Sequence, residues 1–243
     1  TSSSVSFTNG KGYAVAIDGD NNGNVGFVGG IQTSTVNIAL VEKVGVGTGN
    51  QWNLVSNPFS TYIAINDNAK NASSATGSVL YKNAVGTDVL GYVSGEDSVF
   101  LWNGTNGWHT ITNSSAATFA APGQAFFVSA ADGSDNSNFV FYESMQTTIN
   151  GMNTTQLDDG ISGDIMSEDR AELFINLTQS ESNYNTEIYF LENMSDGMDA
   201  TYDGAIFGLD NSELKIYTRT IQEDQGINLA VQALNFTEMW DKI

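Results

Sequence analysis

The chain has 243 residues, 40% of them hydrophobic, and a formal net charge of −20 at pH 7. This size and hydrophobicity suit one large or two modest β domains with a packed core, and they argue against global disorder. Only eight residues are Lys or Arg, which argues against nucleic acid and against an anionic membrane surface as partners. The negative charge is explained either by solubility in a salty exterior or by calcium binding.

The sequence contains no Cys, so the fold does not use disulfides, even if the protein is exported. No stretch approaches the roughly 20 apolar residues of a membrane span, so we expect no direct membrane insertion. No signal peptide is visible at Thr1, and both ends of the chain look like the interior of something longer. We therefore expect the chain to be an excerpt from a larger polypeptide.

Short strands separated by turn residues are predicted over residues 1–146. In chain order they lie at 12–17, 24–28, 35–41, 51–55, 98–102, 107–111, 124–129 and 139–142. The turn residues at 18–23 predict a hairpin between the first two strands. Pro58 closes the fourth strand, because proline cannot continue a central ladder. The less regular stretch 62–84 predicts a loop with a short helix.

A break in composition follows the first strand series. Residues 147–169 are polar and contain no apolar run longer than two, which predicts a linker or a long connection. A second series of strands is predicted at 170–177, 187–191, 214–218 and 227–231. The expected fold class is all-β, with two jelly-roll-like or immunoglobulin-like β-sandwich modules in tandem, at 1–146 and 170–243. We expect the second module to be truncated at its C-terminus.

Several sequence strings occur in a distinctive order. They are GYAV at 12–15, FVG at 27–29, WNLVSNPF at 52–59, LWNG at 101–104 and APGQAFFV at 121–128. This order resembles the C-terminal regions of large proteins exported by the type IX secretion system of Bacteroidota, where the strings look like GWNLVGNPF and APGQGFFV. LFINLT at 173–178 and DATYD at 199–203 resemble the module that follows in that family. Ser56 and Ala125 stand where the family usually has Gly.

The resemblance implies an extracellular or cell-surface protein associated with the outer membrane. Such a protein is typically an adhesin or a polymer-degrading enzyme with accessory modules. The implied partners are the type IX secretion machinery and cell-surface components. The resemblance implies no catalytic site in this region, and the sorting domain lies outside the chain. The physical reading of the strings is structural: Trp52, Leu54, Phe126 and Val128 alternate as expected core-facing strand positions.

Catalysis is not expected from the side chains available. A Ser–His–Asp triad would need His109, the single His of the chain, and no Gly-x-Ser-x-Gly turn is present. One His and no Cys also leave too few donors for a zinc site. A carboxylate pair for glycoside hydrolysis is not excluded by counting the acids, but these residues fall mainly in turns. We therefore predict that the chain is not an enzyme.

Two loops offer the oxygen donors that calcium prefers. The first copies the opening half of a calcium loop, but Gly29 stands where the closing acid is needed. The candidate ligands are Asp18, Asp20 and Asn22 in the first loop, and Asp196, Asp199 and Asp203 in the second. We predict that any bound metal is calcium at one of these loops. The alternative for both loops is an ordinary polar turn.

Three aromatic side chains are candidate platforms for sugar rings, namely Tyr92, Trp102 and Trp108. The alternative is that they pack in the core or as cross-strand pairs. Our leading hypothesis is a non-catalytic structural or adhesive module of a secreted or cell-surface protein exported by the type IX system. The alternative is a carbohydrate-binding accessory module of a polysaccharide-degrading enzyme. An exposed planar row of aromatics would favour the alternative, and buried tryptophans would favour the structural module.

Overall fold

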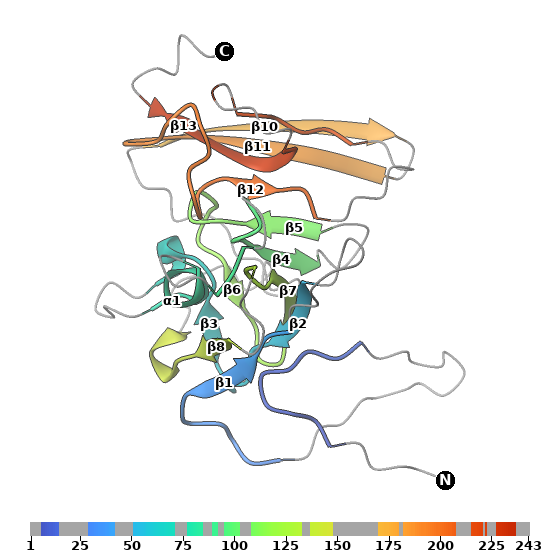
Figure 1. The fold of residues 1–243 in the computed structure, drawn as a ribbon, viewed down its shortest axis with the longest axis vertical. Helices are drawn as coiled ribbons and strands as arrows, with labels where there is room; N and C mark the ends of the chain where they lie inside the picture. Colours follow the sequence, from blue (N-terminus) through green and yellow to red (C-terminus); the bar gives the residue numbers. More distant parts are fainter. Residues whose placement is uncertain are drawn as a thin grey trace.

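In the computed structural model of the chain, the described residues form four β-sheets and one short α-helix, α1 (Val79–Asn83) (Figure 1). Two single-turn 3-10 helices, η2 (Asp67–Ala69) and η3 (Glu143–Met145), accompany them. The fold is all-β, as the strand pattern predicts. The structure describes residues 6–14, 29–41, 51–70, 77–84, 89–91, 95–102, 108–132, 137–147, 170–179, 182–207, 215–220, 222 and 227–236.

Three of the sheets are built from strands that precede residue 148, and all their pairings are antiparallel. The largest has the order β2 (Trp52–Ser56), β7 (Ala125–Ser129), β4 (Val99–Trp102), β5 (Trp108–Ile111). A second sheet pairs β1 (Val36–Ala39) with β8 (Asn138–Phe141). In the third, β3 (Tyr62–Ala64) lies between β6 (Phe119–Ala120) and β9 (Gln146–Thr147).

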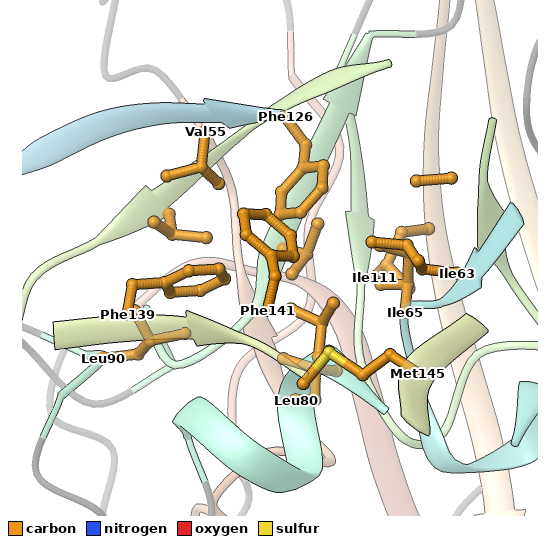
Figure 2. Packing of buried hydrophobic residues seen from close by; sticks show 14 of the residues in the cluster. Val55, Ile63, Ile65, Leu80, Leu90, Ile111, Phe126, Phe139, Phe141 and Met145 are labelled. Atoms are coloured by element: carbon orange, nitrogen blue, oxygen red, sulfur yellow. The ribbon is translucent and has the colours of Figure 1, made fainter. Parts of the chain in front are cut away.

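One face of the four-stranded sheet buries the main hydrophobic core (Figure 2). Val55 of β2 and Phe126 of β7 point into this core, where Phe126 contacts the rings of Phe139 and Phe141 from β8. Helix α1 adds Leu80, which is fully buried. Its N-terminal cap is the Ser78 side chain, which accepts a hydrogen bond from the Tyr81 backbone. The helix therefore closes part of the core.

The opposite face of the four-stranded sheet carries Trp52 and Leu54. Because side chains alternate along a strand, their position follows from the burial of Val55 on the core face. The prediction that Trp52 and Leu54 face the core is therefore wrong, whereas it is confirmed for Phe126 and Val128. The sequence alternation gives the period of β2, but both of its faces carry apolar residues. The pattern alone could not decide which face meets the core.

The strands after residue 170 form the fourth sheet. Its order is β10 (Ala171–Gln179), β11 (Ser182–Leu191), β13 (Leu229–Asn235), β12 (Gly204–Ala205). The pairing of β11 with β13 is parallel, and the other two are antiparallel. We call the residues before 148 the first part of the chain. No strand of the fourth sheet pairs with a described strand of this first part. Residues 148–169 lie outside the described residues, so the linker and the tandem-sandwich arrangement stay predictions.

The structure differs from the predicted elements at a few places. Residues 215–218 form no strand; only Thr218 makes an isolated bridge, to Leu229. Residues 12–14 also form no strand, although the Gly12 backbone donates to the Leu54 carbonyl. The predicted strand 24–28 and hairpin turn 18–23 lie outside the described residues. Helix α1 confirms the short helix expected within 62–84, and β3 was not predicted.

Asn66 ties separate segments of the first part together. Its side chain is fully buried, and Nδ2 lies 2.9, 3.0 and 2.9 Å from the carbonyl oxygens of Thr112, Ser115 and Ala116. Its Oδ1 accepts a hydrogen bond from the Thr118 backbone at 3.1 Å. Buried carbonyl oxygens lose water on folding, so this amide supplies the donors that they need.

We expect Asn66→Ala to lower the free energy of unfolding by about 3 kcal/mol, because it leaves several buried polar groups without partners. Urea denaturation measures this change. Asn37→Ala is the control, since Asn37 is exposed on β1, and it should change stability by less than about 0.5 kcal/mol. Equal effects of the two substitutions would contradict the assignment.

Candidate functional site

Residues 195–207, here called the docking loop, cross from the fourth sheet to the first part of the chain. The Ala205 backbone donates to the Gly95 carbonyl at 2.9 Å, and the Asn113 backbone donates to the Thr201 carbonyl at 2.8 Å. The Thr110 hydroxyl donates to the Ala205 carbonyl at 3.0 Å. These hydrogen bonds run in both directions between the two parts, so the docking loop fixes them together.

Thr201 adopts a backbone conformation that a β-branched residue rarely takes. Its φ of 65° lies in the left-handed region, where a side chain with a branched Cβ is strained. Its backbone N–H donates to Asp97 at 2.6 Å. Asn113 donates to its carbonyl from the backbone and to its hydroxyl from the side chain. Contacts with the first part of the chain therefore hold the strained conformation in place.

Gly204 is a point of very close approach between the two parts. A Cβ built at this position would lie 2.5 Å from Cγ2 of Thr110 and 2.8 Å from Cγ2 of Thr112. Such distances are too short for carbon atoms, so only glycine lets the backbone pass here. Gly204 also pairs with Val231 in the fourth sheet, which joins the docking loop to β13.

Phe207 covers the outer face of the four-stranded sheet. Its ring centroid lies 4.8 Å from that of Trp52, 5.1 Å from Phe100, 4.9 Å from Trp108 and 5.3 Å from Phe127. These aromatic side chains come from all four strands of the sheet. Aromatic pairs at such separations add to the gain from burial. The outer face is thus partly covered by the docking loop itself.

Two carboxylates are sequestered where the docking loop meets the rest of the structure. Asp203 is fully buried and accepts hydrogen bonds from the backbones of Asp199 at 2.6 Å and Ala233 at 2.7 Å. Burial raises the pKa of Asp203 to about 7, against the effect of these hydrogen bonds, and the charges of Asp199 and Asp97 raise it further. Burial also raises the pKa of Asp97, whose Oδ1 has no hydrogen-bond partner among the described residues.

Arg170 forms a second connection between the parts. Its guanidinium donates to the Ser114 carbonyl at 3.2 Å, pairs with Glu172, and lies 5.0 Å from the centroid of the Tyr189 ring. The Tyr189 hydroxyl donates to Glu187 at 2.7 Å. Burial raises the pKa of Glu187. These side chains contact one another and the backbone, which is typical of a network that stabilises the fold.

The structure brings together part of the second predicted calcium loop. Asp199 and Asp203 interact within the docking loop, and Asp199 also accepts from the Ser195 backbone at 2.7 Å. Asp196 accepts a weaker bond, at 3.4 Å, from Gln222. Within the described ranges, no group of three or more His, Cys, Asp or Glu residues is placed to hold a metal ion. The first predicted loop, Asp18, Asp20 and Asn22, lies outside the described residues, and calcium binding stays a prediction.

The candidate sugar platform is divided between two environments. Trp102 is 42% exposed, whereas Trp108 is half-buried against Phe127 and Phe207. The two tryptophans are cross-strand partners with ring centroids 5.3 Å apart and an interplanar angle of 66°. They therefore do not form one planar row. Tyr92 lies outside the described residues.

His109 lies half-buried on β5, directly opposite Leu101 of β4.

Sequence reasoning did not single out Asp97, Gly204 or Phe207, which are central to the docking loop and its contacts. The only signals for them were the glycine next to Asp203 and the short apolar run 205–207. Neither signal identifies the surface that the loop meets, because that surface is about 100 positions away in the sequence.

The fold and the docking loop define an all-β protein in which a second group of strands is fixed onto the first. The chain belongs to the family described as "Domain of unknown function (DUF8693)", whose model matches residues 1–241. No curated protein and no solved structure matched the chain. Among the described residues, no helix has the length and apolar character needed to span a membrane.

Proposed function

We propose that this chain is a non-catalytic structural or adhesive module of a larger secreted or cell-surface bacterial protein exported by the type IX secretion system. The observation that carries the proposal is the docking loop. Its hydrogen bonds to Gly95, Thr110 and Asn113 join the two parts of the chain into one unit. A module that spaces or presents other domains needs such rigidity, because flexible joints would let its neighbours reorient freely.

The polar groups of the interface support the same proposal. The Asp203 carboxylate accepts hydrogen bonds from the backbones of Asp199 and Ala233, and the Asn113 side chain donates to the Thr201 hydroxyl. These hydrogen bonds stabilise the fold. A catalytic carboxylate instead needs access to substrate and a partner for proton transfer. The resemblance of the WNLVSNPF and APGQAFFV strings supplies the export route and the surface location, which remain part of the proposal.

A carbohydrate-binding accessory module is the second candidate function. The exposure of Trp102 favours it, because an exposed indole can stack on a sugar ring. The 66° angle to Trp108 and the packing of Trp108 against Phe207 weigh against it, since a platform needs coplanar rings. Calcium binding as a structural ion stays a prediction. Thermal melting of the protein with calcium, and then with a chelator, tests it.

Polysaccharide binding and hydrolysis separate the two functions. We expect the chain to pass unretarded through affinity gels cast with bacterial and plant polysaccharides, and to release no reducing sugar from them. Trp102→Ala and His109→Ala should behave as the wild type in both assays. Binding that Trp102→Ala abolishes in a folded variant would favour the carbohydrate-binding module. Hydrolysis that His109→Ala abolishes would overturn the non-catalytic proposal.

A further inference from the structure

Strand β10 forms an edge of the fourth sheet and carries apolar residues on both of its faces. Among the described residues it pairs with β11 alone, over nine residues (Figure 1). Leu173, Phe174 and Ile175 follow one another along the strand and are 36%, 49% and 36% exposed. A long apolar edge of this kind is a template for pairing with another strand, and monomeric proteins usually protect such edges with charges, bulges or proline.

On one face of β10, the three apolar residues Leu173, Ile175 and Leu177 are arranged symmetrically about Ile175. If a second β10 lies antiparallel to the first with Ile175 opposite Ile175, then Leu173 of each copy lies opposite Leu177 of the other. Phe174 then lies opposite Asn176. Apolar residues directly opposite in an antiparallel pair stabilise the pairing, so this register brings Leu onto Leu and Ile onto Ile. An arrangement with two-fold symmetry also closes on itself, which prevents unlimited growth.

The β10 edge is poor in charge, which allows a second acidic copy to approach there. Each chain carries a net charge of −20, so most approaches between two copies are repulsive. Residues 173–179 contain no ionisable side chain, and Glu172 is paired with Arg170. In the symmetric register, the two Glu172 side chains lie at opposite ends of the ladder. The β10 edge is therefore a place where two such acidic chains can meet without placing like charges opposite one another.

We propose that two copies of this chain associate by antiparallel pairing of their β10 strands, centred on Ile175. The proposal does not rest on the proposed function of the chain. A single strand edge forms a small interface, so the dimer is weak and depends on concentration. Because salt screens the repulsion between the two acidic chains, raising the salt concentration strengthens the dimer.

A single introduced cysteine tests the register directly, since the chain has no Cys. Residues directly opposite in an antiparallel pair have Cα atoms about 4.5–5.5 Å apart, within the about 4.4–6.8 Å that a disulfide spans. Ile175→Cys should therefore oxidise to a covalent dimer many-fold faster than Ile31→Cys at equal concentration. Ile31 is the matched control because it is 75% exposed and lies outside β10. Equal rates would overturn the proposed register.

Sedimentation velocity over a concentration series tests the association itself. The wild type and Ile31→Lys should dimerise, more strongly at about 0.5 M than at about 0.05 M salt. Ile175→Lys and Ile175→Glu should each be monomeric, because each sets like charges opposite one another. An equimolar mixture of these two variants should form a heterodimer. Thermal melting checks that the wild type and all three variants are folded.

Three outcomes would overturn the proposal. One is a wild type that stays monomeric at every concentration and salt. Another is a dimer that survives Ile175→Lys, which means that the interface lies elsewhere. The third is a monomer whose β10 edge binds an added extended apolar peptide, which means that the edge serves a different protein strand.

Discussion

Replacing Gly204 with alanine is expected to lower the free energy of unfolding by about 1–3 kcal/mol. The new methyl group would lie 2.5 Å from Cγ2 of Thr110 and 2.8 Å from Cγ2 of Thr112. Either the docking loop or the Thr110 and Thr112 side chains must move to relieve this overlap. That movement would stretch the hydrogen bond from the Thr110 hydroxyl to the Ala205 carbonyl. Urea denaturation followed by circular dichroism measures the loss.

Serine substitutions provide a rescue that identifies the cause. Thr110→Ser and Thr112→Ser remove the two methyl groups that the new Cβ would meet, and Thr110→Ser keeps a hydroxyl for the bond to Ala205. In the Gly204→Ala background they should recover part of the lost stability, which a double-mutant cycle reports as coupling. Gly29→Ala is the neutral control, since nothing lies within 4 Å of its Cβ. Additive effects with no recovery would show that Gly204 does not act through this contact.

Between pH 5 and pH 8 the chain is expected to lose about 3 kcal/mol of stability through Asp203. Burial raises the pKa of Asp203 from 3.8 to about 7, so the folded protein keeps a proton that the unfolded chain releases. This contribution is fully present below about pH 4 and is lost as pH rises through about 7. The total contribution of Asp203, from the unfolded-state pKa to the folded-state pKa, is about 4 kcal/mol. Burial raises the pKa of Asp97 in the same direction.

Asp203→Asn should flatten this dependence, because the amide has no proton to release in the same range. The measurement is the free energy of unfolding in urea at pH 5 and at pH 8, for both proteins. Glu192→Gln is the control, because Glu192 is exposed and lies close to the end of β11. This substitution also removes one negative charge, and it should keep the wild-type slope. A wild-type slope in Asp203→Asn would assign the pH dependence to other groups.

Local sequence pattern was enough to predict most long strands. The alternation at 124–129 predicted β7 (Ala125–Ser129), and that at 98–102 predicted β4 (Val99–Trp102). The end of β2 before Pro58 was also anticipated. The structure adds that Asn57 is buried and donates to the carbonyls of Thr61, Ala120 and Ala121. These strands and the end of β2 depend on neighbours in the sequence, which is why the pattern revealed them.

Features that depend on distant contacts could not be predicted. Strand β12 has two residues, too few for any periodicity, and it forms where Gly204 meets Val231 and the Thr110 side chain. Residues 214–218 alternate like a strand, yet of the described residues there only Thr218 forms a bridge. Asp203 was expected either as a calcium ligand or in an ordinary polar turn, and its complete burial was not predicted. In each case the deciding contact lies far away along the chain.

The two groups of strands are expected to behave as one unit joined by the docking loop. Native-state hydrogen exchange tests this at two amides, Asn113 and Ala205, which donate across the junction to Thr201 and Gly95. Both amides should open with nearly the same free energy as those of the central strand β7, and Gly204→Ala should lower their protection. Fast exchange of Asn113 and Ala205 beside a fully protected β7 would contradict it.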